Sequence, residues 1–192
     1  MYLMTSTSAS SVPLPLSSGT LAIVADGLGH GEQAASAASR VIDTVESAAG
    51  ELTLLDVTRR CHDALIEDSR GAVVSLAYHN PEQGVVTWLG VGNVEGRLLL
   101  RTSHGQYLQE CLLLRPGILG RRLPHLQPSI RRVNPGDLLI LATDGISGDF
   151  ADDLPIDAHV EDIARDILRR CGKGTDDALV LVMRYMAHAP SR

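Results

Sequence analysis

Acidic side chains stand at the ends of three apolar segments that are far apart in the sequence. They are Asp26, which follows TLAIVA, Asp144, which follows LLILAT, and the pair Asp176 and Asp177, which precedes ALVLVMRY. A carboxylate just beyond a buried strand is held rigidly, and strands that share an edge would bring such carboxylates together. Converging anions repel each other, and a bound cation relieves that repulsion. The pattern therefore indicates a metal site, although a single Asp-Gly after a strand is more often an ordinary turn.

The types of these ligands indicate which metal and which chemistry to expect. Oxygen ligands without paired histidine or cysteine favour hard ions, magnesium or manganese. Gly27 and Gly145 follow two of the aspartates and let the backbone approach closely, so that a carbonyl oxygen can serve as a further ligand. Two such cations can share a water, lower its pKa and clamp a phosphoryl group for in-line attack. No nucleophilic side chain is then required, and no G-x-S-x-G motif occurs.

Histidine is the next candidate for a catalytic role. His30 lies in the glycine-rich segment DGLGHG that begins at Asp26, where it could protonate a leaving oxygen or contact a phosphate. The other six histidines show no ligand spacing, and we interpret them as structural or exposed.

Two further charged groups have weaker patterns. The acidic segment after Asp144 is interpreted as a solvated loop rather than as extra ligands, and it contains Asp149, Asp152 and Asp153. Four arginines could guide a phosphoprotein by bidentate contacts, but a solvated sheet edge is the simpler interpretation of Arg121, Arg122, Arg131 and Arg132.

The segment DGLGHG also resembles the phosphate-binding loop of a dinucleotide fold. Gly27, Gly29 and Gly31 lie between a predicted strand and a predicted helix. The pattern requires glycine at position 32, however, where the chain has Glu32, and acidic residues would repel a pyrophosphate. This dehydrogenase-like interpretation remains a minor alternative.

The segments that position these residues predict an α+β fold. Helices come in a block, hairpins follow, and one helix and one strand end the chain, which favours antiparallel sheets covered by helices. We expect helices at 32–48, 53–68 and 157–171 and strands at 20–25, 72–79, 85–91, 96–101, 111–114, 128–133, 138–143 and 178–185. Residues 1–18 are expected to form a flexible or irregular N-terminal lead-in, residues 19–186 a single domain and residues 187–192 a C-terminal tail.

Composition narrows the class of protein further. The chain has 192 residues, of which 44% are hydrophobic and 3% aromatic, so one domain with an aliphatic core is expected. The net charge of -6 and the absence of a basic run argue against nucleic acid as a ligand. No apolar stretch reaches about 18 residues, which argues against a membrane span. Three separated cysteines without a C-x-x-C pair, and no signal-peptide pattern, indicate reduced thiols in a cytoplasmic protein.

Four segments together resemble a known family. LAIVADGLGHGEQAA, GVGNVEGRLLL, NPGDLLILATDGI and GTDDALVLV occur in this order between about Leu21 and Tyr185. They resemble the protein phosphatase 2C (PPM) superfamily, in its small bacterial SpoIIE/RsbX-like branch of sporulation and stressosome phosphatases. The resemblance implies a four-layer α-β-β-α sandwich with two antiparallel sheets.

The resemblance also implies a metal site with two divalent cations, manganese or magnesium. Asp26 resembles the aspartate that bridges both metals, and Gly27 resembles the glycine whose carbonyl binds one of them. Asp144 resembles the aspartate of the later Asp-Gly motif. Asp176 resembles the first acid of the terminal pair, with Asp177 as its neighbour in the metal site. Together with His30, the candidate acid named above, Asp26 and Asp144 are the expected catalytic residues.

The implied activity is that of a metal-dependent protein serine/threonine phosphatase that uses a metal-activated water. The implied substrates are stressosome or STAS-domain-type phosphoproteins, and we expect a monomer. Three departures from the family pattern bear on this activity: no Asp or Glu precedes Asp26, Leu28 stands in place of a histidine, and Gly148 stands in place of an acid. They favour a slow enzyme or, as the alternative, a catalytically weak or inert relative that binds and regulates a signalling partner.

Overall fold

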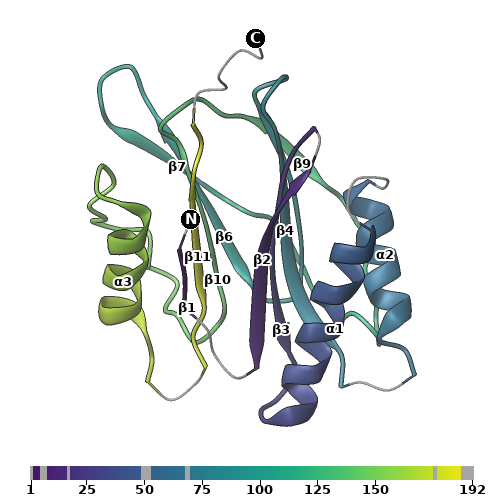
Figure 1. The fold of residues 1–192 in the computed structure, drawn as a ribbon. Coiled ribbons are helices and arrows are strands. Elements are labelled where there is room, and N and C mark those ends of the chain that lie inside the picture. The colour runs from purple at the N-terminus through teal and green to yellow at the C-terminus, as the bar shows by residue number, and fades with distance from the viewer. Residues whose placement is uncertain are drawn as a thin grey trace.

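Two β-sheets pack face to face, and helices cover both outer faces (Figure 1). The computed structural model describes residues 2–4, 8–16, 18–48, 53–67, 70–174 and 177–186. Helices α1 (Glu32–Ala48) and α2 (Leu54–Ala64) cover one sheet, and α3 (Val160–Cys171) covers the other. This is the α-β-β-α sandwich that the resemblance implies, and the predicted fold class is confirmed. None of the described helices is long and apolar enough to cross a membrane.

The first sheet has the strand order β1-β11-β10-β6-β7, and all its neighbours are antiparallel. Its strands are β1 (Tyr2–Met4), β11 (Val180–Arg184), β10 (Leu138–Ala142), β6 (Glu95–Arg101) and β7 (Tyr107–Cys111). Every residue of β10 is buried, because alternate side chains enter two different cores. Leu139 and Leu141 pack between the sheets, whereas Ile140 packs with Ile163 and Ile167 of α3.

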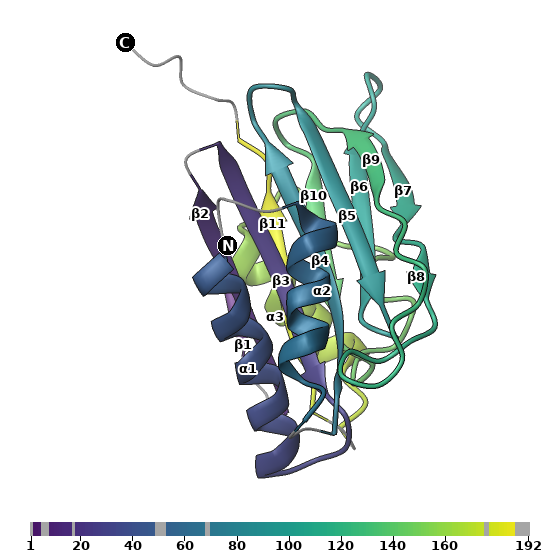
Figure 2. The same cartoon turned by 90° about the vertical axis from the view of Figure 1, so that its right-hand side faces the viewer.

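The second sheet has the strand order β2-β3-β4-β5-β8, and β9 also pairs with β5. Its strands are β2 (Ala9–Leu16), β3 (Gly19–Gly27), β4 (Ala72–Asn80), β5 (Val85–Val91), β8 (Leu114–Arg115) and β9 (Ser129–Arg132). Figure 2 shows α1 and α2 lying across the outer face of this sheet. Among its described strands, the short pairing of β8 with β5 is parallel and the others are antiparallel.

The antiparallel pairing of β3 excludes the dinucleotide-binding alternative. β3 runs antiparallel to both β2 and β4. A dinucleotide-binding loop requires a parallel βαβ unit, in which the strand before the glycine-rich loop lies beside a parallel strand. The segment DGLGHG is therefore the connection between an antiparallel strand and α1.

The N-terminal region corrects one expectation. Residues 2–4 and 9–16 form strands β1 and β2, whereas an irregular lead-in was expected up to residue 18. Pro13 and Pro15 lie two residues apart, so both place their missing N–H group on the same side of β2. β2 is an edge strand, where that side needs no partner. The predicted C-terminal tail at 187–192 lies outside the described residues.

The helices follow the predicted pattern, with shifts at their ends. The side chain of Thr53 accepts a hydrogen bond from the backbone N–H of Asp56 and caps α2. α2 ends at Ala64 rather than at residue 68, and α3 begins at Val160 rather than at residue 157. The backbone N–H of Ala158 donates to the carbonyl of Pro155, so a turn occupies the expected first residues of α3.

The strand predicted at 111–114 is displaced. β7 ends at Cys111, and Leu114 begins the two-residue β8. β7 is an edge strand with half-buried and exposed side chains, so it lacks the apolar run on which the prediction depended.

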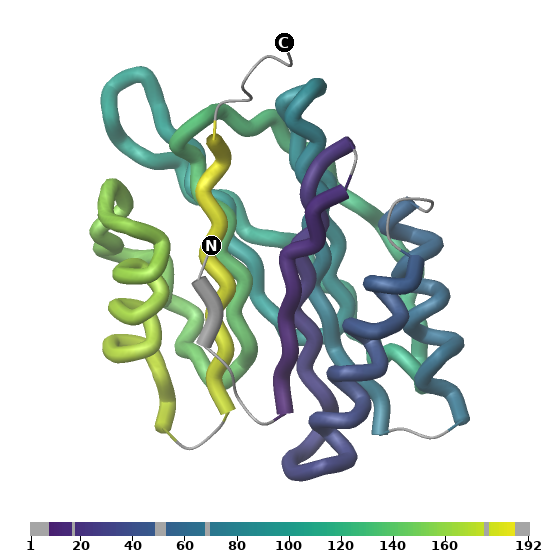
Figure 3. Tube along the Cα trace, in the orientation of Figure 1, coloured from purple at the N-terminus to yellow at the C-terminus, as the bar shows by residue number. Residues whose placement is uncertain are grey.

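Strands from early and late parts of the chain lie in the two facing sheets (Figure 3). β3 belongs to one sheet, and β10 and β11 belong to the other. Asp26 is the second-last residue of β3, Asp144 follows β10 and Asp177 precedes β11. The sandwich thus gathers three distant acidic segments at one of its ends.

Candidate active site

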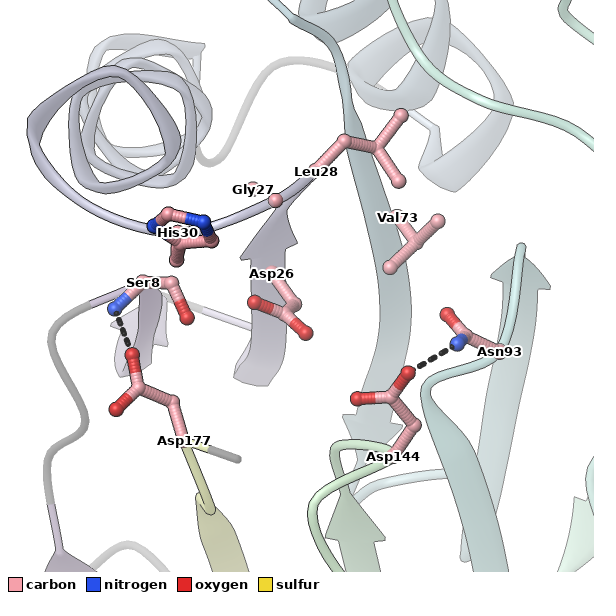
Figure 4. Close-up of a pocket in the computed structure, with 10 residues that line it drawn as sticks. Ser8, Asp26, Gly27, Leu28, His30, Val73, Asn93, Asp144 and Asp177 are labelled. Atoms are coloured by element: carbon pink, nitrogen blue, oxygen red, sulfur yellow. Dashed lines mark hydrogen bonds between the residues drawn. The ribbon is translucent and has the colours of Figure 1, made fainter. Parts of the chain in front are cut away.

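A cavity of about 210 Å³ lies where these three segments meet (Figure 4). Its wall comprises the segment 26–30 together with Ser8, Val73, Asn93, Asp144 and Asp177. The structure therefore brings together Asp26, Gly27, His30, Asp144 and Asp177 from the predicted site. Asp176 lies outside the described residues.

Asp26 is half-buried at the end of β3, between Ala9 of β2 and Val73 of β4 in the strand register. The next residue must be glycine for steric reasons. A Cβ atom on Gly27 would lie 1.9 Å from the carbonyl oxygen of Ala34 in α1. The Asp-Gly pair therefore lets the start of α1 close over the strand end that carries Asp26.

Asp144 is exposed to the cavity and is held at both its side chain and its backbone. The amide Nδ2 of Asn93 donates to Oδ2 of Asp144 at 2.7 Å, and Nζ of Lys173 donates to the backbone carbonyl of Asp144 at 2.6 Å. A Cβ atom on Gly145 would lie 2.2 Å from the carbonyl oxygen of Asp177. The second Asp-Gly pair thus packs directly on the terminal acidic segment.

Asp177 contacts the N-terminal region. The backbone N–H of Ser8 donates to Oδ2 of Asp177 at 3.0 Å, and the carbonyl of Ser8 accepts a hydrogen bond from the N–H of Gly27 at 3.0 Å. Ser8 is buried, with 5% of its surface exposed. One residue therefore connects the first Asp-Gly turn with the terminal acids.

The donors around the cavity suit a hard divalent cation. The described lining offers carboxylate and backbone carbonyl oxygens, one exposed imidazole and no thiol. Such oxygen donors are those that Mg²⁺ and Mn²⁺ prefer. No group of three or more His, Cys, Asp or Glu side chains within the described residues forms a preformed metal cage. The match between this site and a divalent cation thus depends on the type of donor atoms and on their lining of the same cavity.

The weaker candidates lie elsewhere. Arg131 forms an ion pair with Glu110, and none of the four candidate arginines belongs to the described lining of the cavity. Asp152 and Asp153 line a different cavity beside β7. The ring Nδ1 of His62 accepts a hydrogen bond from the N–H of Gly120, which is a structural role.

Three residues near the aspartates were not identified from the sequence: Ser8, Asn93 and Lys173. Asn93 follows a glycine at the end of a predicted strand, which is a turn signal that also fits a residue at a sheet edge. Ser8 acts through its backbone, and a backbone hydrogen bond leaves no mark on the residue type. Lys173 lies in a glycine-rich loop that resembles an ordinary helix end.

Comparison with known proteins gives the following matches. Residues 17–186 match the family described as Stage II sporulation protein E (SpoIIE). Phosphoserine phosphatase RsbX of Bacillus subtilis (strain 168) is 29% identical over 155 residues, which cover 80% of this chain and 75% of RsbX.

Solved structures resemble almost all of the chain. A crystal structure of RsbX in complex with magnesium has a TM-score of 0.80 and 24% identity, covering 94% of this chain and 91% of that chain. A structure described as "The bacterial stressosome: a modular system that has been adapted to control secondary messenger signaling" has a TM-score of 0.82 and 28% identity, covering 95% and 96%. The PP2C phosphatase domain of SpoIIE from Bacillus subtilis has a TM-score of 0.74 and 18% identity, covering 97% and 59%.

Proposed function

We propose, because the chain belongs to the SpoIIE family and is a protein phosphatase of the PP2C (PPM) type, that it hydrolyses phosphoserine or phosphothreonine with the help of two divalent cations. The observation that carries this proposal is the meeting of Asp26, Asp144 and Asp177 around one cavity. The magnesium bound in the RsbX structure, whose fold this chain shares, supports a metal-dependent reaction.

Each residue has a proposed role. Asp26, the carbonyl of Gly27, Asp144 and Asp176 hold the cations, which are manganese or magnesium. Bound cations supply positive charge at the phosphoryl group and lower the pKa of water. Asp177 belongs to the same acidic site, and its carboxylate is held by the hydrogen bond that it accepts from the backbone N–H of Ser8.

His30 has a separate proposed role as an acid. Its side chain is exposed in the cavity wall, three residues beyond Gly27, where β3 ends. An imidazolium at this place can donate a proton to the serine or threonine oxygen as it leaves. The exposed position leaves room for a protein substrate to reach it.

The proposed substrate is a phosphorylated protein of the stressosome, with the phosphate on a STAS-type domain. The stressosome is named in the description of the 28% identical structure, and RsbX is a phosphoserine phosphatase. We propose a cytoplasmic monomer that binds neither nucleic acid nor membrane. The net charge of -6 is consistent with a partner other than nucleic acid.

A phosphate-release assay tests this proposal. A phosphorylated STAS-domain protein and an unrelated phosphoserine protein are each incubated with the full chain, with manganese chloride or with EDTA. We expect phosphate release from the STAS-domain protein that requires manganese and is slower from the unrelated protein. Equal rates from the two proteins would contradict the proposed preference for a STAS-domain substrate. Phosphate release that is unaffected by EDTA would contradict the proposed dependence on a metal.

One observation favours a second candidate, an inert relative that binds a signalling partner. Ala9 of β2 lies opposite Asp26 of β3 in the strand register. β2 therefore places no carboxylate beside Asp26, in keeping with the absence of Asp and Glu before Asp26 in the sequence. Hydrolysis of p-nitrophenyl phosphate with and without manganese separates the two functions. An enzyme shows turnover that depends on manganese, whereas an inert relative binds the phosphoprotein without turnover.

A further inference from the structure

We infer that Asn93 is a positioning residue for Asp144. Its side-chain amide holds one oxygen of the Asp144 carboxylate and thereby fixes the direction in which the other oxygen is presented. Figure 4 shows the two side chains facing each other from different strand ends, with the second oxygen of Asp144 turned away from Asn93. The inference rests on the proposed function, because it concerns how one proposed ligand is aimed at a cation.

The contact has the geometry and polarity of a strong hydrogen bond. The distance of 2.7 Å between Nδ2 of Asn93 and Oδ2 of Asp144 is at the short end of the range for N–H···O bonds. An ionised carboxylate only accepts hydrogen bonds, so the amide nitrogen must be the group that faces Asp144. Asparagine also adds no negative charge to a cavity whose described lining already includes three carboxylates.

The turn that carries Asn93 is anchored on both sides. A Cβ atom on Gly92, which has φ +94°, would lie 2.1 Å from Cγ1 of Val73, and the N–H of Gly92 donates to the carbonyl of Arg115 at 2.9 Å. On the other side, Oγ of the buried Ser75 donates to the carbonyl of Val94 at 2.6 Å. The amide of Asn93 is therefore presented from a rigid turn, as a positioning group requires.

The backbone of Asp144 has its own supports. Lys173 donates from Nζ to the carbonyl of Asp144 and from its backbone N–H to the carbonyl of Gly145. These contacts hold the backbone of the turn without the help of Asn93. Asn93 thus acts on the side chain of Asp144, and its removal is expected to change cation affinity more than folding.

Calorimetric titration of the full chain with manganese chloride tests the inference. We expect Asn93→Ala to raise the dissociation constant for manganese about tenfold, as is typical when the partner of a ligand is removed. The control is Asn134→Ala, the same substitution in the exposed turn that precedes the start of β10. Its dissociation constant for manganese should match that of the wild type. Affinity of Asn93→Ala within about twofold of the wild type would overturn the inference. No binding by the wild type would overturn the proposed metal site and this inference together.

A second measurement needs no metal. Asn93→Asp and Asn93→Ala both lose the donor, but Asn93→Asp also places a carboxylate against Asp144. In EDTA at neutral pH, we expect the Tm of Asn93→Asp to be about 2–4 °C below that of Asn93→Ala, because the two carboxylates repel each other. Equal Tm values would mean that side chain 93 does not face Asp144, and would contradict the inference even if the protein is a metal-dependent phosphatase.

Discussion

At the scale of single residues, each Asp-Gly pair of the proposed site also meets a packing requirement. Gly27 lies against the backbone of α1, and Gly145 lies against the backbone of Asp177. In both cases the missing side chain lets an aspartate and another part of the cavity wall come together. Because the glycine is needed for this packing, the Asp-Gly pair appears in the sequence as a unit, and the pair could be recognised there.

Gly145→Ala tests this packing. Its Cβ would lie 2.2 Å from a backbone carbonyl oxygen, which cannot move aside as a flexible side chain would. We expect the free energy of unfolding to fall by about 1–3 kcal/mol, as is typical of an overpacked site. Urea denaturation measures the change, and Gly148→Ala, whose Cβ would have its nearest contact at 3.6 Å, should leave stability nearly unchanged.

Asp26→Asn tests the chemistry of the proposed bridging ligand. The substitution keeps the shape of the side chain and removes its charge, so manganese-dependent hydrolysis of p-nitrophenyl phosphate should fall about 100-fold or more, comparable to the loss of one electrostatic stabiliser. Asp43→Asn on the exposed face of α1 is the matched control. Undiminished turnover of the Asp26 variant would remove this residue from the site.

What the sequence left unassigned at this scale has a physical reason. Asn93 lies just before β6, and β6 pairs with β10 so that Glu95 is opposite Ala142. Only this strand pairing brings the Asn93 amide to Asp144. Ser8 contributes its backbone. Strand-end aspartates can be recognised by the apolar runs beside them, whereas these partners have no such pattern.

At the scale of elements, hydrophobic periodicity predicted the central strands and the helices well. β10 is apolar at every position because it is covered on both sides, and the helices have clear apolar faces. The edge strands were harder to predict. β2 contains two prolines and β7 has only half-buried and exposed side chains, because an edge strand needs neither every backbone donor nor two buried faces.

The buried face of α2 leads to a prediction about thiol reactivity. Burial raises the pKa of the Cys61 thiol to about 12, so this thiol stays protonated at pH 8 and is a poor nucleophile. Cys171 is also buried, whereas Cys111 is exposed on β7. We expect a disulfide reagent such as DTNB to modify Cys111 rapidly in the native protein, and the other two cysteines only after urea is added. Rapid modification of Cys61 in the folded protein would contradict the packing of α2.

At the scale of the whole molecule, the N-terminal region joins the two sheets at the site. β1 belongs to the sheet of β10 and β11, and β2 belongs to the sheet of β3. Between them, Ser8 makes hydrogen bonds with Asp177 and with Gly27. The layered architecture could be predicted from the order of elements, but the role of this segment could not, because its residues resemble a linker.

Ser8→Pro tests this connection. Proline lacks the N–H group that donates to the Asp177 carboxylate, whereas Ser8→Ala keeps it. Loss of a hydrogen bond to a charged group is expected to lower the free energy of unfolding by about 1.5–3 kcal/mol in Ser8→Pro. Urea denaturation of the two variants compares them directly, and equal stability would show that the bond to Asp177 contributes little.

The central claim is that distant acidic segments of this fold share cations. A crystal of the full chain soaked in manganese chloride and measured for anomalous scattering tests it most directly. We predict two anomalous peaks about 3.5–4 Å apart, next to the carboxylates of Asp26 and Asp144. A well-ordered crystal with no peak in this cavity, or with manganese bound only elsewhere, would contradict the account.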